Sequence, residues 1–316
     1  FMVTAVFAND DNDKVFSLPR YSSLYTFPIL EKRPKCDAFT KLDGDIWWII
    51  ETVAFSPELD GQQLIASGSS WDNQILIWDS STGKLLHKLD HEELHSVVFS
   101  PDGQWLASGS EYGNTIKIWD TRDWQNKHDL KSPSNKVSLV AFSPERSDGK
   151  QFLASGNGLN TGDETIKIWD TSDWELIREI NVGEEWVNSV AFSPDGQLLA
   201  SGSGDAEVRI WNPNTGRLLR TLDSQYGWVY SVAFSPELDG QQLIASGSGN
   251  GTIKIWNPNK RKPLDSLGVY KSGVASVTFS PKRKDGKQFL ASGSSDETVI
   301  IWEPNTGKLL HTLERF

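Results

Sequence analysis

A serine–histidine–aspartate triad is the first chemistry that this sequence suggests, because Ser-Asp pairs recur along the chain and His91 lies four residues before His95. The chain contains only five histidines, however, and none lies in a nucleophile elbow or in an HExxH motif. The sequence also lacks paired cysteines, a glycine-rich phosphate loop and a cluster with the spacing of metal ligands. We therefore predict that the protein is not an enzyme and uses no metal or cofactor.

Tryptophan is the more informative residue type, and it points to contact surfaces and packing. Six of the 14 tryptophans recur in one setting, Ile-Trp followed by Asp, Asn or Glu, at intervals of 41 to 50 residues. These six are Trp78, Trp119, Trp169, Trp211, Trp256 and Trp302. A period of this length predicts a repeat architecture.

The repeat unit is clearest in residues 187–222, which contain four short stretches of apolar residues separated by turns. The first stretch alternates apolar with small or polar residues, which is typical of a half-buried strand. Pro-Asp-Gly at 194–196 and Asn-Thr-Gly at 214–216 are turn sequences. One four-stranded sheet cannot bury both of its faces, so neighbouring copies must cover them, and a closed ring leaves no sheet face exposed.

These repeats resemble the WD-repeat (WD40) family of β-propellers. The resemblance rests on the six Ile-Trp endings and on the Ser-Pro turns, and it is strong over residues 44–316 and weak over 1–43. The copies are unusually alike, since residues 54–69 and 233–248 are identical. Such uniform propellers resemble those of prokaryotic multidomain proteins, among them signalling NTPases, kinases and caspase-like proteases.

The resemblance implies an all-β chain that folds as a single β-propeller over residues 1–316. We expect seven four-stranded blades, with a divergent first blade in residues 1–43; six blades with an N-terminal extension is the alternative. Closure of the ring would rest on side chains alone or on an upstream segment. Because the chain begins at Phe1, we expect a domain of a longer protein or a processed chain. The six regular blades are expected at 44–90, 91–131, 132–181, 182–223, 224–267 and 268–316.

The family also assigns structural roles to repeated residues. A turn aspartate joins a hydrogen-bonded network with an entrance histidine, a strand serine and the repeated tryptophan. Only His91 lies near the place of the entrance histidine, so we expect each aspartate to cap its own turn. We expect the six tryptophans to seal each blade against the next. The matching turn aspartates are Asp72, Asp163, Asp205 and Asp296.

The entrance loops and the turns between second and third strands share the top face of a propeller. Aromatic and acidic residues gather at these positions, which the fold does not fix. Exposed aromatics mark contact sites, and acidic neighbours favour a basic partner. The alternative is that several of these rings pack inward over the blade tops. The candidate partner-binding residues are Trp48, Trp71, His95, Tyr112, Trp186, Asn188, Trp228 and Tyr230.

The charge balance narrows the choice of partner. A formal net charge of −11 makes nucleic acid an unfavourable partner. The basic runs 260–262 and 282–284, with Lys287, would form a patch on the bottom face, for which a solvated loop is the simpler interpretation. No apolar run reaches the roughly 18 residues needed to span a membrane. Cys36 is the only cysteine, which is compatible with the reducing cytosol where we expect the protein.

We therefore predict a non-catalytic scaffold or sensor module that binds a protein or peptide through an aromatic and acidic top face, which favours a basic partner. The isolated domain is expected to be monomeric and to belong to a larger signalling or defence protein. The alternative function is a small-ligand sensor that binds a sugar or a cationic amine in the central funnel.

Overall fold

The computed structural model describes residues 52–58, 61–69, 73–110, 113–132, 136–157, 164–183, 185–222, 227–237, 241–268, 270–281 and 287–314, and all structural statements below concern these residues. They form six four-stranded antiparallel sheets, and in each sheet the strands pair in chain order. The fold prediction of an all-β chain of four-stranded sheets is confirmed. The seventh blade predicted in residues 1–43 lies outside the described residues.

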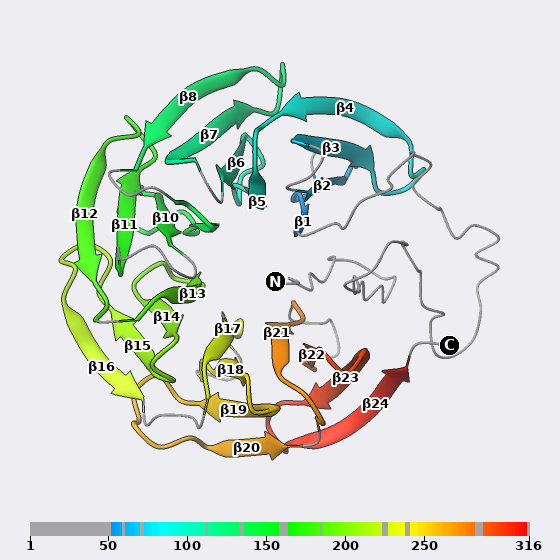
Figure 1. Ribbon diagram of the computed structural model, residues 1–316, viewed down its shortest axis with the longest axis vertical. Helices are drawn as coiled ribbons and strands as arrows, with labels where there is room; N and C mark the ends of the chain where they lie inside the picture. Colours follow the sequence, from blue (N-terminus) through cyan, green and yellow to red (C-terminus); the bar gives the residue numbers. More distant parts are fainter. Residues whose placement is uncertain are drawn as a thin grey trace.

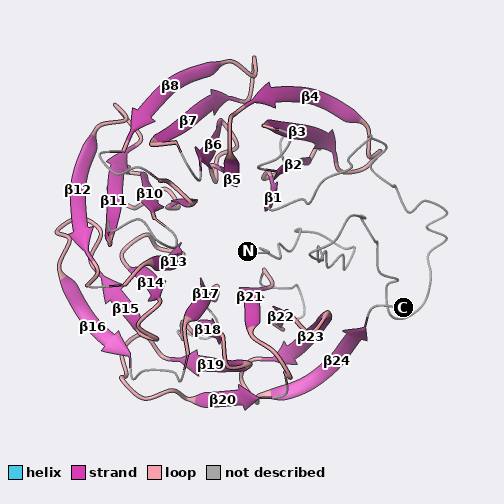
Figure 2. Cartoon of the chain, viewed as in Figure 1, coloured by secondary structure: helices cyan, strands magenta, loops and turns pink. Residues whose placement is uncertain are grey.

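The strands are short, four to seven residues each, and tight turns connect many of them (Figure 2). The first three sheets consist of β1 (Thr52–Phe55), β2 (Leu64–Ser69), β3 (Gln74–Asp79) and β4 (Leu85–Asp90); β5 (Leu94–Phe99), β6 (Trp105–Ser110), β7 (Thr115–Asp120) and β8 (Asn126–Lys131); and β9 (Leu139–Phe142), β10 (Phe152–Gly156), β11 (Thr165–Asp170) and β12 (Leu176–Asn181).

The last three sheets repeat this pattern. They consist of β13 (Val187–Phe192), β14 (Leu199–Ser203), β15 (Val208–Trp211) and β16 (Leu218–Leu222); β17 (Val229–Phe234), β18 (Ile244–Ser248), β19 (Thr252–Trp256) and β20 (Asp265–Gly268); and β21 (Val274–Phe279), β22 (Leu290–Ser294), β23 (Thr298–Glu303) and β24 (Lys308–Glu314).

The six sheets follow one another around a common centre, as the blades of a propeller do (Figure 1). The first strand of each sheet lies near the centre and the fourth strand lies at the rim. Each first strand contacts the first strand of the next sheet, from β1 to β21. The arc of described sheets is open between β1–β4 and β21–β24 (Figure 1).

The core lies between the sheets. Five clusters of buried apolar residues each join two consecutive sheets, and each contains the repeated tryptophan of the later sheet. Trp302, for example, packs with Ile253 and Leu267 of the preceding sheet. Strand alternation makes this possible, because every second side chain points to the same face of a sheet.

Hydroxyl groups on the first strands add polar links between sheets. The amide of Val232 donates to Ser189 Oγ of the preceding sheet at 3.1 Å, and the amide of Val277 donates to Ser231 Oγ at 3.1 Å. A threonine serves in the same way near β1, since the Val97 amide donates to Thr52 Oγ1 at 3.0 Å. These bonds fix the register of one blade against the next.

In five of the six described sheets, the turn before the fourth strand contains a residue with positive φ, five residues after the repeated tryptophan. Glycine fills this place in three sheets, at Gly83, Gly216 and Gly307, with φ of 66° to 70°. In two sheets the residue is Trp124 or Trp174, with φ of 57° and 63°. Bulky residues rarely adopt this conformation, so these two turns carry backbone strain that packing must offset.

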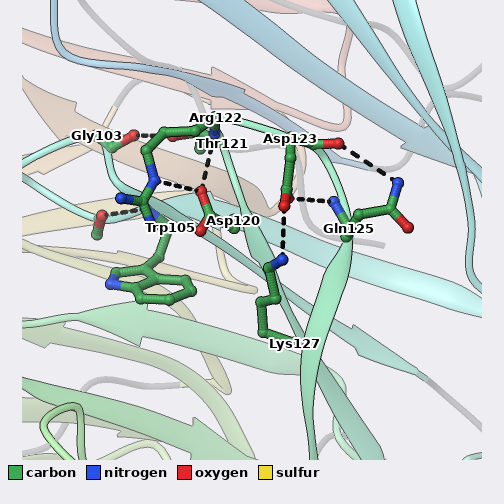
Figure 3. A network of polar contacts seen from close by, with 9 residues as sticks. Gly103, Trp105, Asp120, Thr121, Arg122, Asp123, Gln125 and Lys127 are labelled. Carbon is green, nitrogen blue, oxygen red and sulfur yellow. Dashed lines mark hydrogen bonds and ion pairs between the residues drawn. The ribbon is translucent and has the colours of Figure 1, made fainter.

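Polar contacts hold the turn that contains Trp124 (Figure 3). Asp120 accepts hydrogen bonds from the Arg122 amide and Nε, both at 2.9 Å, and pairs with Nη2 at 2.6 Å. Hydrogen bonding to Arg122 lowers the pKa of the Asp120 carboxyl to about 2. Asp123 pairs with Lys127 Nζ at 2.6 Å, and Thr121 donates to the Gly103 carbonyl at 2.6 Å. The network is local, and it gives these charged residues a structural role.

Candidate interaction surface

The six repeated tryptophans have a single arrangement. Each is at most 6% exposed, and each indole Nε1 donates to the hydroxyl of a serine on the second strand, at 2.7 to 3.0 Å. A buried N–H without an acceptor would destabilise the fold, so the serine is needed wherever the tryptophan is buried. The serine partners, in chain order, are Ser67, Ser108, Ser155, Ser201, Ser246 and Ser292.

His91 joins this structural network and shows no triad geometry. Its Nδ1 lies 2.7 Å from Ser108 Oγ, which also accepts the Trp119 bond. Burial, together with a smaller effect of the nearby Lys117 ammonium, lowers the pKa of His91 to about 4. A serine hydroxyl that is already bonded to an indole is a poor nucleophile candidate, and the imidazole is enclosed.

Tyr270 takes a similar place in the last sheet, which sequence reasoning missed. Its hydroxyl lies 2.5 Å from Ser292 Oγ and donates to the Ser292 carbonyl at 2.8 Å. Burial raises the pKa of the Tyr270 phenol. The sequence does contain a signal, since this tyrosine lies four residues before the first strand of its sheet. The family pattern has a histidine at this place, however, and does not point to a tyrosine.

The described turn aspartates accept hydrogen bonds from their own turns. Asp296 accepts the Thr298 amide at 3.1 Å and its hydroxyl at 2.5 Å. Asp205 accepts bonds from Ser203 and Arg209. Burial acts to raise the pKa of Asp205, but these bonds outweigh it and the pKa lies below its usual value. Asp72 and Asp163 lie outside the described residues.

Three of the partner-binding candidates meet on the top of sheets β13–β16 and β17–β20. The ring centroids of Trp186 and Trp228 lie 5.4 Å apart at an interplanar angle of 76°, and those of Trp228 and Tyr230 lie 6.3 Å apart at 77°. Both contacts are edge-to-face, the geometry that aromatic quadrupoles favour. We call Trp186, Trp228 and Tyr230 the aromatic cluster.

Glycines in the neighbouring turns make room for two of these rings. A Cβ on Gly204 would lie 2.6 Å from Trp186 Cε2, and a Cβ on Gly249 would lie 3.2 Å from Tyr230 Cε2. Both rings therefore lie close against turn backbone. Sheets β13–β16 and β17–β20 share Ser-Gly-Ser-Gly at this place, which no other described turn has.

Trp186 and Trp228 occupy matching positions, each directly before the first strand, but they differ in exposure. Trp186 is half-buried over Gly204 and its Nε1 is enclosed without a hydrogen-bond partner in the described structure, whereas Trp228 is 46% exposed. The inward-packing alternative therefore describes Trp186 better than Trp228. Asn188 donates from Nδ2 to the Val229 carbonyl at 3.0 Å, so its amide links the two sheets.

The remaining candidates do not join the aromatic cluster. His95 lies half-buried in β5, and the whole sheet β9–β12 lies between that strand and the cluster. Trp48, Trp71 and Tyr112 lie outside the described residues. Over the described ranges, no group of three His, Cys, Asp or Glu residues has an arrangement that would hold a metal ion. The same ranges contain no helix long and apolar enough to cross a membrane.

The four-stranded sheets with their repeated tryptophans can be compared with known protein families. Five segments match the family model of the WD domain, G-beta repeat, at 45–79, 83–120, 174–212, 216–257 and 261–303, which together cover more than half of the chain. The chain belongs to the WD40 repeat family. Strands β9, β10 and β11 of this WD40 chain fall between the second and third matched segments, and they still pair with β12 in a four-stranded sheet.

One relative is similar to part of this WD40 chain. It is the small ribosomal subunit protein RACK1y of Oryza sativa subsp. japonica, which is 44% identical over 72 residues. The match covers 22% of this chain and 20% of the relative, so the chain matches about a fifth of that protein's length. WD40 domains are generally non-catalytic scaffolds for protein interactions, which fits the predicted class of function.

Proposed function

We propose that this WD40 domain binds a protein or peptide through the aromatic cluster on its top face. The observation that supports this most directly is Trp228, which is 46% exposed and yet touches Trp186 and Tyr230 edge to face. An exposed ring that neighbours already hold in place loses little conformational entropy on binding. Exposed tryptophan and tyrosine are also the residue types that dominate binding energy at interfaces.

The partner we propose presents a basic side chain to this cluster. The faces of tryptophan and tyrosine attract cations, and the net charge of −11 would steer a basic partner toward the domain. Local acidic groups contribute less than the sequence suggests, because Arg209 pairs with both Asp205 and Glu207. We therefore assign recognition to the rings and assign only steering to the overall charge. Acyl-transfer or metal chemistry has no assembled site in the described residues.

The test is a comparison of matched variants in quantitative affinity capture from cell extract. Trp228→Ala removes the exposed ring, and Leu309→Ala is the matched control because Leu309 is 41% exposed on β24, whose sheet contributes no residue to the cluster. We expect Trp228→Ala to deplete specific partners that Leu309→Ala retains, with unchanged melting temperatures for both. Equal capture by the two variants would contradict the proposal. Stabilisation of the wild-type domain by sugars or amines would favour the small-ligand alternative.

We further propose that residues 1–43 supply a seventh blade and that the propeller belongs to a larger signalling or defence protein. Support for the blade comes from the cores, since each repeated tryptophan from Trp119 onward packs against the preceding sheet. Trp78 is fully buried too, and a preceding blade would give it the same packing. Removal of residues 1–43 should lower the melting temperature by several degrees. An unchanged value would favour six blades.

A further inference from the structure

The outer strand β16 is the one described outer strand that exposes two adjacent leucines, whereas β24 exposes only Leu309. In β4 and β12 the first two residues are half-buried and the next two are exposed. In β16 the pattern is reversed, because Leu218 and Leu219 are 43% and 46% exposed whereas Arg220 and Thr221 are half-buried. Two adjacent exposed leucines at the rim of a charged protein mark a contact surface more strongly than scattered ones do.

The loop of the following sheet lies beside β16. In two earlier sheets a tryptophan of the next sheet lies on the preceding outer strand, as Trp124 does on His87, with ring centroids 5.1 Å apart. The loop after β19 has no tryptophan, and here Arg220 Nη1 of β16 donates to the Asn259 carbonyl at 2.5 Å. This bond holds the 257–263 loop beside β16, as the bond from Arg178 to the Asn214 carbonyl holds the corresponding loop beside β12. The two leucines are therefore exposed beside a loop that is held in place.

A groove of about 310 Å³ follows β16. It is lined by all five residues of the strand together with Glu207 and Arg261. Five residues of extended chain span about 17 Å, so the groove has the length of a short strand. β16 is the last strand of its sheet, so in the described structure its outer backbone edge has no ladder partner.

The charge along this groove is positive. Glu207 lines one part, but its carboxylate pairs with Arg209 at 2.7 Å. Arg261 lines the groove, and its chain neighbours Lys260 and Lys262 are both exposed. The basic run of the sequence therefore lies next to the exposed leucines, in a domain that is acidic as a whole.

We propose that β16 is a second docking site, where an extended acidic segment of a partner protein adds as a fifth strand to sheet β13–β16. The outer edge of β16 supplies main-chain hydrogen bonds, as in other cases of strand addition. Leu218 and Leu219 receive apolar side chains of the segment, and Arg261 receives a carboxylate. The surface lies at the rim and does not depend on the aromatic cluster.

The test uses a fluorescein-labelled peptide of eight residues in which valine alternates with glutamate, measured by fluorescence anisotropy. Leu218→Ser and Arg261→Glu should each weaken binding by about tenfold, the scale of one lost apolar or charge-assisted contact. Leu309→Ser is the matched control, because Leu309 lies seven residues after Trp302 as Leu218 does after Trp211. The control and Trp228→Ala should bind like wild type.

Backbone methylation separates strand addition from a purely electrostatic contact. Two versions of the peptide carry N-methyl groups on alternate amides, in opposite registers. One version should lose binding and the other should retain it, because only every second amide of an added strand faces β16. Equal binding of both versions, or an unchanged affinity of Leu218→Ser, would overturn the proposal. So would Arg261-dependent binding to phosphatidylserine vesicles without binding of the peptide.

Discussion

His128 of β8 lies against Trp174 of the next sheet, with ring centroids 5.6 Å apart at an interplanar angle of 32°. Trp174 is only 7% exposed, and its φ of 63° is one that other sheets give to glycine. Trp105 and Phe142 also contact the Trp174 ring, at 5.4 and 6.3 Å between centroids. The sheets β5–β8 and β9–β12 are thus joined at the rim by a strained residue that aromatic packing holds.

Trp174→Gly should therefore lower the free energy of unfolding. Loss of a buried tryptophan costs about 3 to 5 kcal/mol, and relief of the positive φ returns about 1 kcal/mol. The net loss of about 2 to 4 kcal/mol can be measured by urea denaturation. Trp124→Gly is the control, since Trp124 is half-buried and should lose less. If Trp174→Gly is as stable as wild type, the free energy gained by packing the ring only equals the free energy lost to backbone strain.

His91 should make stability depend on pH between about 6.5 and 4. Burial and the nearby Lys117 ammonium lower the pKa of His91 in the folded state to about 4, so the unfolded chain binds this proton more tightly. Stability is then complete above pH 6.5 and falls as the pH drops toward 4, by at most about 3 kcal/mol from this residue. His91→Gln should flatten this part of the urea-denaturation profile, whereas His311→Gln, at an exposed site, should not. Parallel profiles for wild type and His91→Gln would refute this assignment.

Ser292, like Ser108, should matter more than the other serines at the same place, because it has two side-chain partners. Ser292→Ala leaves the buried Trp302 indole without an acceptor, which costs about 1 to 3 kcal/mol, and also removes the Tyr270 contact. Tyr270→Phe alone should cost about 1 kcal/mol. The double variant should be less destabilised than the sum of the two losses, in thermal or urea unfolding. Strict additivity would mean that the two contacts are independent.

Gly204→Ala should disturb the aromatic cluster with little effect on global stability. The new methyl group would lie 2.6 Å from Trp186 Cε2, so the ring must move away from the turn and from Trp228. We expect a changed tryptophan fluorescence spectrum and weaker capture of the partners that depend on Trp228. Gly293→Ala is the control, because a methyl group at that position would have no neighbouring atom within 4 Å. Identical spectra for the two variants would show that Trp186 tolerates the methyl group in place.

Much of the fold could be predicted because each repeat is specified by residues that lie close together in the sequence. In the strand that ends in Ile-Trp, side chains alternate between the two faces of the sheet. A serine on the neighbouring strand supplies the acceptor that a buried indole needs. The third partner of this network could not be predicted in the same way. His91 and Tyr270 reach Ser108 and Ser292 from outside the strands, and a loop side chain reaches a partner only where its neighbours place it.

The sequence predicts which residues form the candidate site, but it does not predict how their side chains are arranged. The sequence places Trp186 and Trp228 at matching points before β13 and β17, and by itself it determines a WD40 repeat with aromatic residues at the blade entrances. Only the tertiary structure decides that one ring lies over Gly204 while the other stands exposed. It alone also reveals that Leu218 and Leu219 are both exposed beside the basic loop after β19. The physical reason is that strand periodicity is local, whereas the exposure of a side chain depends on residues contributed by the next blade.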